Sequence, residues 1–310
     1  MSQLLVLVGP TASGKTAVAC EIAKHLSVEA VSCDSMQVYR GLSLLSQAPT
    51  PREKKALKAR LILFVDPSEE YNAALFRRDA LLAIEKIQKK GRLPLVVGGT
   101  GLYVRALLDG LFEETGSGRS QDDKFRSKLL SEQEKHGGHH LHDRLQKVDA
   151  PSAARIHPND HRRLMRALEV HHATGRPMSE LRPERSGLRA TMSCRLFLLD
   201  RDRADLYRRI DRRVESMVRK GLLVEVRRLA RRKPGRTASM ALGYREMKEV
   251  LEKKMELREA VELLKKNTRN YAKRQLSWFR HEKGVESVAV GENETPKETA
   301  KKILGLWDRG

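Results

Sequence analysis

The sequence has few of the features that mark secreted or membrane proteins. Only three cysteines, Cys20, Cys33 and Cys194, occur in 310 residues, and their spacing fits neither a disulfide framework nor a cysteine metal site. Such scarcity is typical of proteins of the reducing cytoplasm. The N-terminal apolar run is only five residues long, and no apolar segment of about 20 residues follows it. We therefore expect neither a signal peptide nor a membrane span, and a cytoplasmic protein.

Acidic and aromatic residues are also scarce. The chain has 40 Asp and Glu against 61 Lys and Arg, which gives a net charge of +21, and only 5% of its residues are aromatic. The excess is concentrated in residues 201–280, with 25 basic against 11 acidic residues. Part of it will be ordinary solvated helix surface. However, residues 268–280 interleave cations with aromatics, which favours a nucleic-acid partner.

The most informative segment is a glycine-rich turn at the N-terminus. Apolar residues 4–8 predict a buried strand, residues 17–26 predict a helix, and the turn between them reads GPTASGKT. This is the P-loop signature of nucleotide-binding proteins, whose backbone N–H groups surround phosphate oxygens. Lys15 would supply a charge, and Thr16 a hydroxyl for Mg²⁺. A turn without a ligand is the weaker alternative. The candidate phosphate-binding residues are Gly9, Pro10, Thr11, Ala12, Ser13, Gly14, Lys15 and Thr16.

Two further segments are expected at the same place in the fold. Strands are predicted at 28–32, 60–65, 93–97, 195–200 and 285–290. Asp34 follows the second strand of the chain, and Thr100 lies in a GGTG turn after the strand at 93–97. Because the carboxyl ends of parallel strands share one edge, both should join the P-loop. Asp34 could hold Mg²⁺, accept a proton or cap a helix, and these alternatives stay open here.

The middle of the chain has a different pattern. Residues 115–120 resemble a linker, and helices without strands are predicted at 122–135, 139–148 and 160–174. The sequence thus predicts an α/β fold: a P-loop parallel-sheet core of residues 1–115 and 194–310, with a helical insertion of residues 116–193. Histidines cluster at 136–142, but they lack a partnering ligand set, and we expect surface histidines without metal.

These segments together resemble one family, the tRNA dimethylallyltransferases, which are the bacterial isopentenyltransferases that modify adenosine next to the anticodon. The P-loop alone is shared by many unrelated enzymes, whereas the whole set in this order is specific. The segments are GPTASGKT at 9–16, DSMQVYRG at 34–41, GGTGLY at 98–103, IHPNDHRRLMRALEV at 156–170, RIDRR at 209–213, ASMALGYRE at 238–246 and TRNYAKRQLSWFR at 268–280.

The resemblance implies a reaction and roles for individual residues. The family transfers a dimethylallyl group from dimethylallyl diphosphate to N6 of adenosine 37 and releases diphosphate. The P-loop would then hold the diphosphate of the prenyl donor rather than ATP, with Mg²⁺ as the cofactor. Asp34 matches the general base on N6, Thr100 its partner near the reacting centre, and Arg213 an arginine that binds the leaving diphosphate.

The resemblance also implies the surface that meets the tRNA anticodon stem-loop. Asn270 and Ser277 stand where relatives often have other polar residues, and the eukaryotic zinc finger is missing, which favours the bacterial form. We separately expect the enzyme to be a monomer. The residues that match tRNA contacts are Asp34, Ser35, Met36, Gln37, Thr100, Arg162, Arg163, Leu164, Met165, Arg166, Met240, Ala241, Leu242, Gly243, Tyr244, Arg245, Lys273, Arg274, Gln275 and Arg280.

Three other functions are compatible with parts of the sequence. An adenylate isopentenyltransferase would share the P-loop but would need neither the basic helix at 268–280 nor the helical insertion. A small-molecule kinase could use Lys15 and Thr16 for ATP. An RNA-binding protein with an inactive P-loop would bind tRNA without any turnover. The order of the motifs favours the tRNA-modifying enzyme over all three.

Overall fold

The computed structural model describes residues 2–111, 119–137, 139–181 and 186–309. It divides into two compact units, which are considered separately below. The first unit comprises Met1–Leu108 and Leu188–Gly310, and the second comprises Asp109–Gly187. The predicted boundary at residue 115, and most of the predicted linker, lie outside the described residues.

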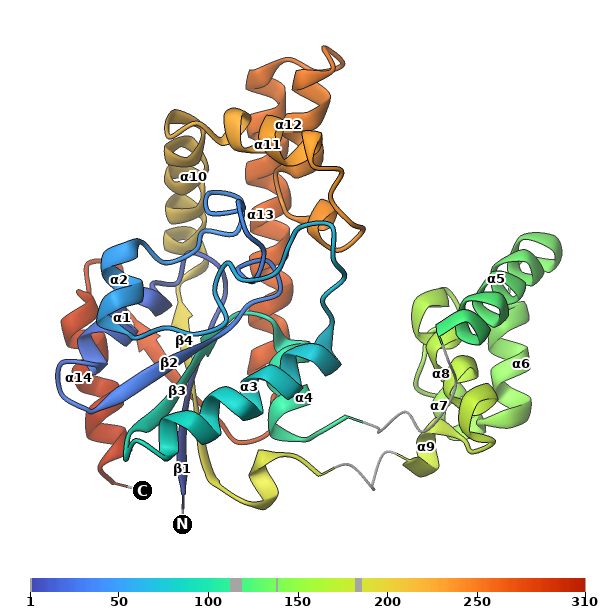
Figure 1. Ribbon diagram of the computed structural model, residues 1–310, viewed down its shortest axis with the longest axis horizontal. Helices are drawn as coiled ribbons and strands as arrows, with labels where there is room; N and C mark the ends of the chain where they lie inside the picture. Colours follow the sequence, from blue (N-terminus) through green and yellow to red (C-terminus); the bar gives the residue numbers. More distant parts are fainter. Residues whose placement is uncertain (1, 112–118, 138, 182–185, 310) are drawn as a thin grey trace. The chain divides into compact units, whose positions relative to one another are not determined.

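The first unit is built on a five-stranded parallel sheet in the order β2-β3-β1-β4-β5 (Figure 1). Every pairing in it is parallel, which confirms the predicted α/β class. Because β1 is central, the loop that follows it is flanked by loops from both sides of the sheet. The strands are β1 Gln3–Val8, β2 Val28–Cys33, β3 Leu93–Gly98, β4 Ser193–Arg201 and β5 Val285–Val290.

One predicted strand is wrong. Residues 60–65 form only two isolated bridges, in which Arg60 pairs with Val31 and Val65 pairs with Tyr39. Leu61 and Leu63 have φ values of 59° and 54°, in the left-handed region, so the chain cannot stay extended between the two bridges. Apolar content alone suggested a strand, but the turns at the two leucines make this segment a loop beside β2.

The two faces of the sheet carry separate cores, as the alternation along β1 shows. Leu4, Val6 and Val8 lie in one apolar cluster, and Leu5 and Leu7 lie in the other. All five are fully buried. The near-continuous apolar run in β1 is therefore explained by helices on both faces, as expected for a parallel sheet.

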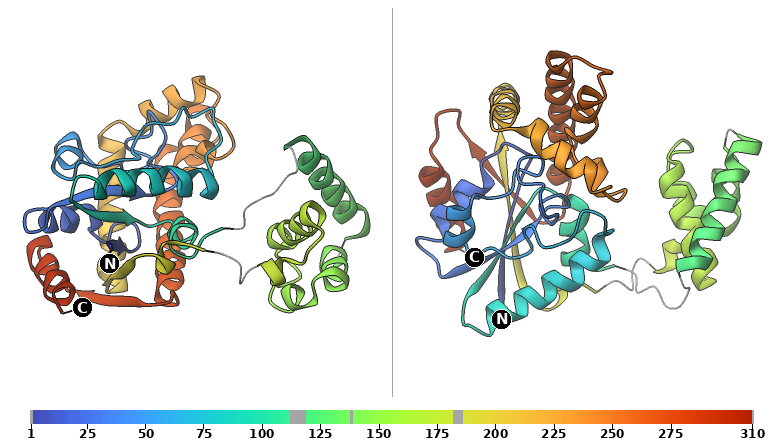
Figure 2. Two further views of the ribbon diagram at one scale, coloured as in Figure 1. Left: turned by 60° about the horizontal axis from the view of Figure 1, so that its bottom comes forward. Right: turned by 45° about the horizontal axis from the view of Figure 1, so that its top comes forward.

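Helices α1 and α14 pack against each other on one side of the sheet, and α10, α11, α12 and α13 form a group of neighbouring helices (Figures 1 and 2). The last of these, predicted at 257–280, has those bounds. The helices of this unit are α1 Lys15–Ile22, α2 Pro51–Ala56, α3 Ala73–Gln88, α4 Gly101–Leu108, α10 Arg203–Arg219, α11 Leu222–Arg231, α12 Tyr244–Leu251, α13 Leu257–Arg280 and α14 Pro296–Trp307, with short 3₁₀ turns at Leu188–Ala190 and Ala238–Met240.

The second unit is helical wherever the structure describes it. Its core contains Leu129, Leu141, Leu145 and Leu164, all fully buried. The buried carboxylate of Asp149 accepts hydrogen bonds from two backbone N–H groups and ties two short helices together. The helices are α5 Arg119–His136, α6 His140–Val148, α7 Ala150–Ala153, α8 His161–Thr174 and α9 Met178–Leu181.

Two kinds of feature are absent from the residues that the structure describes. No cluster of three or more His, Cys, Asp or Glu side chains within the described ranges could hold a metal ion. No helix in the described ranges is both long and apolar enough to cross a membrane.

Candidate active site

The P-loop connects β1 to α1 at the carboxyl edge of the sheet (Figure 1). Gly14 occupies the N-cap of α1 with a φ of 99°, a conformation that favours glycine. The Lys15 ammonium donates hydrogen bonds to the carbonyl oxygens of Gly9 and Pro10, at 2.9 and 2.8 Å. Burial lowers the pKa of Lys15 to about 8, although the negative charge of Asp34 opposes the shift. Lys15 and Asp34 therefore lie close enough to interact.

Two arginines fix the other side of the loop. Arg201 Nε donates to the Ser13 carbonyl and Arg209 Nε to the Ala12 carbonyl, each at 2.9 Å. The buried Ser13 hydroxyl has no hydrogen-bond partner among the residues described. Thr16 is half-buried in the first turn of α1. The loop is thus held by its carbonyl groups and keeps unused hydrogen-bonding capacity for a ligand.

Asp34 follows β2 at the same edge. Its Oδ1 accepts hydrogen bonds from the backbone N–H groups of Met36, at 2.9 Å, and Gln37, at 3.2 Å. No hydrogen bond within the described chain reaches Oδ2. Burial raises the pKa of Asp34, while the two backbone donors and Lys15 limit the rise. One oxygen therefore caps the turn, and the other is free to accept a proton. Capping the turn and accepting a proton, two of the three roles that the sequence left open for Asp34, are therefore compatible in this structure.

Thr100 ties the GGTG turn to the turn that begins at Asp34. Its Oγ1 accepts a hydrogen bond from the Ser35 backbone at 3.1 Å and donates to Ser35 Oγ at 3.5 Å. Its own N–H donates to the Cys33 carbonyl at 3.3 Å. Because Cys33 and Ser35 flank Asp34 in the chain, these contacts bring Thr100 beside the carboxylate, as the strand-end argument predicts.

Arg213 reaches the site from α10. Burial and the nearby charge of Arg209 lower its pKa, and its guanidinium donates a hydrogen bond to Gln47 Oε1. The Gln47 carbonyl accepts a hydrogen bond from the Gln37 side chain at 3.3 Å. Sequence reasoning selected Arg213 and missed Arg209, although a spacing of four residues places both on one face of a helix.

Gln275 of α13 connects the two glycine-rich turns. Its Oε1 accepts a hydrogen bond from Thr11 N at 2.8 Å, and its Nε2 donates to the Gly99 carbonyl at 2.7 Å. A Cβ added at Gly99 would lie 2.5 Å from Gln275 Nε2, and one at Gly101 would lie 2.4 Å from Trp278 Nε1. The GGTG turn needs these glycines because α13 packs directly on it.

Tyr271 is a site residue that the sequence reasoning missed. Burial and the negative charge of Asp34 raise the pKa of its phenol, while hydrogen bonds with Thr100 and Gln275 oppose the shift. Tyr271, Gln275 and Trp278 follow one another at spacings of four and three residues, so one helix face presents all three to the site. This spacing could have identified Tyr271 from the sequence, but the cations in the same segment drew the interpretation toward RNA binding.

The remaining predicted contact residues divide between surface and core. In α8, Arg162, Arg163 and Arg166 are exposed, whereas Leu164 and Met165 are buried in the core of the helical unit. The side chains of Leu164 and Met165 are thus not displayed on the surface of that unit.

The two later segments show the same division. At 240–245, Met240 and Arg245 are exposed, Leu242 is half-buried, and Ala241, Gly243 and Tyr244 are buried. At the end of α13, Lys273 and Arg274 are exposed and Gln275 is buried. Arg280 is paired with the Asp200 carboxylate at 2.9 Å.

The carboxyl edge of the sheet thus gathers a P-loop lysine, a desolvated carboxylate with one oxygen that lacks a partner in the described chain, and arginines from α10. This arrangement is suited to holding a phosphorylated ligand beside a proton acceptor. The family comparisons agree with the motifs. A model of the IPP transferase family matches residues 37–282, and a model of the isopentenyl transferase family matches residues 2–67. The chain belongs to the IPP transferase family, which confirms the resemblance found in the sequence.

Relatives with the same description match nearly the whole chain. A tRNA dimethylallyltransferase of Carboxydothermus hydrogenoformans is 39% identical over 302 residues, covering 97% of this chain and 96% of the relative. One of Symbiobacterium thermophilum is 42% identical over 310 residues, covering 98% of this chain and 94% of the relative.

Solved structures resemble the whole chain as well. The tRNA isopentenylpyrophosphate transferase of Bacillus halodurans is 37% identical with a TM-score of 0.71, covering 100% of this chain and 98% of that one. A eukaryotic dimethylallyltransferase, described as acting on tRNA, is 27% identical with a TM-score of 0.80, covering 99% of this chain and 76% of that one.

Proposed function

We propose that this enzyme transfers the dimethylallyl group of dimethylallyl diphosphate to N6 of adenosine 37 in tRNA and releases diphosphate. Its family and its relatives' names support the reaction class. The observation that carries the proposal is the pairing of a phosphate-type loop with Asp34, whose Oδ2 has no partner in the described chain and which lies close enough to Lys15 to affect its pKa.

The donor's diphosphate binds at the P-loop in this proposal. Negative charge builds on the diphosphate as the allylic C1–O bond breaks, and cations fixed in advance stabilise that charge. Lys15 and Arg213 are desolvated, so their interaction with the leaving group is stronger than it would be in water. Arg209, bonded to the loop itself, adds a third positive charge.

The acceptor amine binds at Asp34. The lone pair of an adenine N6 is delocalised into the ring, so the amine is a weak nucleophile. A carboxylate oxygen that accepts one N–H orients the amine and takes the proton as the C–N bond forms. Thr100 positions this carboxylate through Ser35 and Cys33. Since adenosine 37 stacks within the anticodon loop, it must be extruded to reach the site, at a cost of a few kcal/mol.

Mg²⁺ is the proposed cofactor, and the donor set suits it. The Thr16 hydroxyl in the first turn of α1 would hold the ion together with substrate oxygens, the hard ligands that Mg²⁺ prefers. The unpartnered Ser13 hydroxyl shows that polar groups of the loop remain available. When bound, the ion would neutralise charge on the diphosphate.

The predicted tRNA contacts on α8, at 240–245 and at the end of α13 belong to the same proposal. In this proposal the exposed cations of these segments contact RNA phosphates. The buried residues of the same segments hold those cations in position. The helical insertion predicted at 116–193 would carry the α8 contacts. Three free cysteines suit a cytoplasmic enzyme, and the monomeric state stays a prediction.

One assay separates this proposal from the alternatives. The enzyme is incubated with labelled dimethylallyl diphosphate and Mg²⁺, with unmodified tRNA in one tube and AMP in another. We expect label on the tRNA at adenosine 37 and none on AMP. Label on AMP would favour the adenylate enzyme, and no label on either would contradict a prenyl transfer. Phosphoryl transfer from ATP to a small acceptor would identify a kinase.

A further inference from the structure

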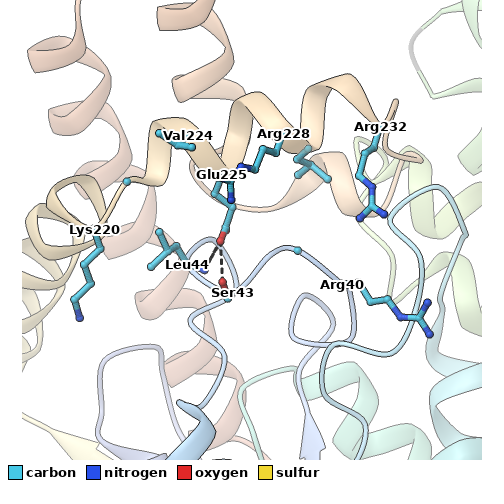
Figure 3. Close-up of a pocket in the computed structure, with 11 residues that line it drawn as sticks. Arg40, Ser43, Leu44, Lys220, Val224, Glu225, Arg228 and Arg232 are labelled. Atoms are coloured by element: carbon cyan, nitrogen blue, oxygen red, sulfur yellow. Dashed lines mark hydrogen bonds between the residues drawn. The ribbon is translucent and has the colours of Figure 1, made fainter.

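A basic pocket lies apart from the P-loop, between α11 and the loop that follows β2 (Figure 3). Its volume is about 720 Å³. Figure 3 shows Arg232 extending from the end of α11 toward the side on which Arg40 lies. The pocket is lined by Arg40, Gly41, Ser43, Leu44, Lys220, Gly221, Val224, Glu225, Arg228, Leu229 and Arg232.

Four cations surround this space without an assigned partner. Arg40, Lys220, Arg228 and Arg232 are all exposed. None of the four side chains makes a hydrogen bond or ion pair with another residue that the structure describes. Arg280, which is also exposed, is by contrast paired with Asp200. The four cations therefore remain available for an external anion.

Nearby carboxylates do not cancel this charge. Glu225 is the only acidic residue in the lining. The pKa of Asp66 is lowered mainly by hydrogen bonds from Ser68 and further by the charges of Arg232 and Arg40, so Asp66 is close enough to interact with both. Two carboxylates against four cations leave the surroundings of the pocket positive.

Glu225 has a structural task instead. Its carboxylate accepts hydrogen bonds from the backbone of Leu44 and Leu45, at 2.9 and 2.8 Å, and from Ser43 Oγ at 2.9 Å. These bonds fix the loop against α11 and so hold Arg40 opposite the arginines of the helix. The same loop begins at Asp34 and continues to Gln47, the partner of Arg213. The pocket and the active site thus share one ordered segment.

We propose that this pocket binds the sugar–phosphate backbone of the tRNA substrate, at a point away from the base that is modified. The lining offers guanidinium forks, which match phosphate oxygens, and contains no aromatic ring on which a base could stack. The contact is therefore one that positions the RNA without reading its sequence. The inference rests on the tRNA substrate proposed above, and it adds Arg40, Lys220, Arg228 and Arg232 to the interface.

The test compares two double variants of the full-length enzyme. Arg228→Ala with Arg232→Ala removes two cations from the pocket, and Lys297→Ala with Lys301→Ala removes two exposed cations from α14. Affinity for unmodified tRNA is measured over a range of salt concentrations, and transfer is measured in single turnover at saturating tRNA. A third variant, Arg228→Lys with Arg232→Lys, keeps the charge.

We expect the pocket alanine variant to bind tRNA roughly three- to thirtyfold more weakly at low salt, as the loss of two exposed charge contacts implies. Its salt slope should fall by roughly one for each lost contact. The lysine pair should restore most of the slope, the α14 pair should behave like the wild type, and the saturated transfer rate should not change.

Wild-type affinity and slope in the alanine variant would overturn the proposal, as would an equal loss in the α14 variant. If tRNA binding responds as expected but no dimethylallyl transfer occurs in any protein, the proposed reaction fails and the RNA contact stands. A lower saturated rate with unchanged affinity would also contradict a backbone contact, since it would point to a role in the chemistry.

Discussion

The site at the sheet edge and the pocket beside α11 use the same residue types in opposite ways. At the sheet edge, Lys15 and Arg213 are desolvated and already hydrogen-bonded to the protein. Beside α11, Arg228 and Arg232 are exposed and have no bonded partner in the described chain. Burial makes each charge strong and fixed in place, whereas exposure makes it weak and sensitive to salt.

The difference assigns separate tasks to the two regions. Fixed, partly buried charges stabilise a transition state without reorganising, so changes at the sheet edge should alter the rate of transfer. Exposed cations act by releasing counterions from RNA, so changes beside α11 should alter affinity and its salt dependence. Each of the following predictions tests whether the two tasks are really separate.

The largest effect is expected at Asp34. Asp34→Asn keeps the shape of the side chain and the cap on Met36 but cannot accept the proton, so turnover should fall by about 10²- to 10⁴-fold. Affinity for tRNA should stay near the wild-type value, and Asp34→Ala should lose most of its turnover as well. Asp308→Asn, at an exposed carboxylate that follows α14, is the control. Similar turnover in wild type and both Asp34 variants would rule out the base role.

The next effect concerns the charge on Lys15. Because burial lowers its pKa to about 8, the free enzyme loses this cation as the pH rises through about 8, and kcat/KM for the prenyl diphosphate should fall there. Asp34 must be deprotonated, and since its pKa is raised, the acidic limb should lie above the usual carboxyl range. A pH profile of kcat/KM checks both limbs.

Two Lys15 variants separate the charge from other causes of an alkaline limb. Lys15→Arg should move the limb to higher pH, because a guanidinium stays charged. Lys15→Ala should raise the Michaelis constant for the prenyl diphosphate or lower turnover. If Lys15→Ala changed only the binding of ATP, the donor would not sit at the P-loop.

Gln275 should give a smaller effect, on stability. Gln275→Ala leaves Thr11 N and the Gly99 carbonyl without their partner, which costs about 1–3 kcal/mol of unfolding free energy for each group that stays dry. Denaturant unfolding measures the loss. Lys273→Ala, at an exposed position of the same helix, is the matched control, and equal stability of the two variants would show that Gln275 does not hold the two turns together.

The smallest effect per residue is expected at the end of α13. Replacing Lys273, Arg274 and Arg280 together with alanine should weaken tRNA binding and flatten its salt slope. Arg280 should contribute least, because Asp200 already neutralises it. Filter binding across salt concentrations gives both quantities, and a slope equal to that of the wild type would exclude this segment from the interface.

Sequence patterns predicted the parts of the site that local chemistry determines. The P-loop, Asp34 and Thr100 each follow a strand, and parallel strands bring such positions to one edge. The loop at 60–65 escaped prediction because apolar content does not reveal the left-handed turns at Leu61 and Leu63.

Contacts over long distances in the chain could not be read in the same way. Gln275 bonds to Thr11 across 264 residues, and nothing local to either residue predicts that bond. Tyr271 and Arg209 were missed for the same reason, since each reaches the site through the packing of a helix against the sheet. The pocket at Arg40 and Arg232 likewise exists only because α11 meets the loop after β2.

The most direct test measures both regions in one experiment. Saturated single-turnover transfer to tRNA and the salt slope of tRNA affinity are determined for wild type, Asp34→Asn, and Arg228→Ala with Arg232→Ala. We predict that Asp34→Asn lowers the transfer rate and leaves the salt slope unchanged. The Arg228→Ala with Arg232→Ala variant should keep the wild-type transfer rate, and the magnitude of its salt slope should fall by about two. If either variant changed both quantities together, the two regions would not have the separate tasks assigned to them here.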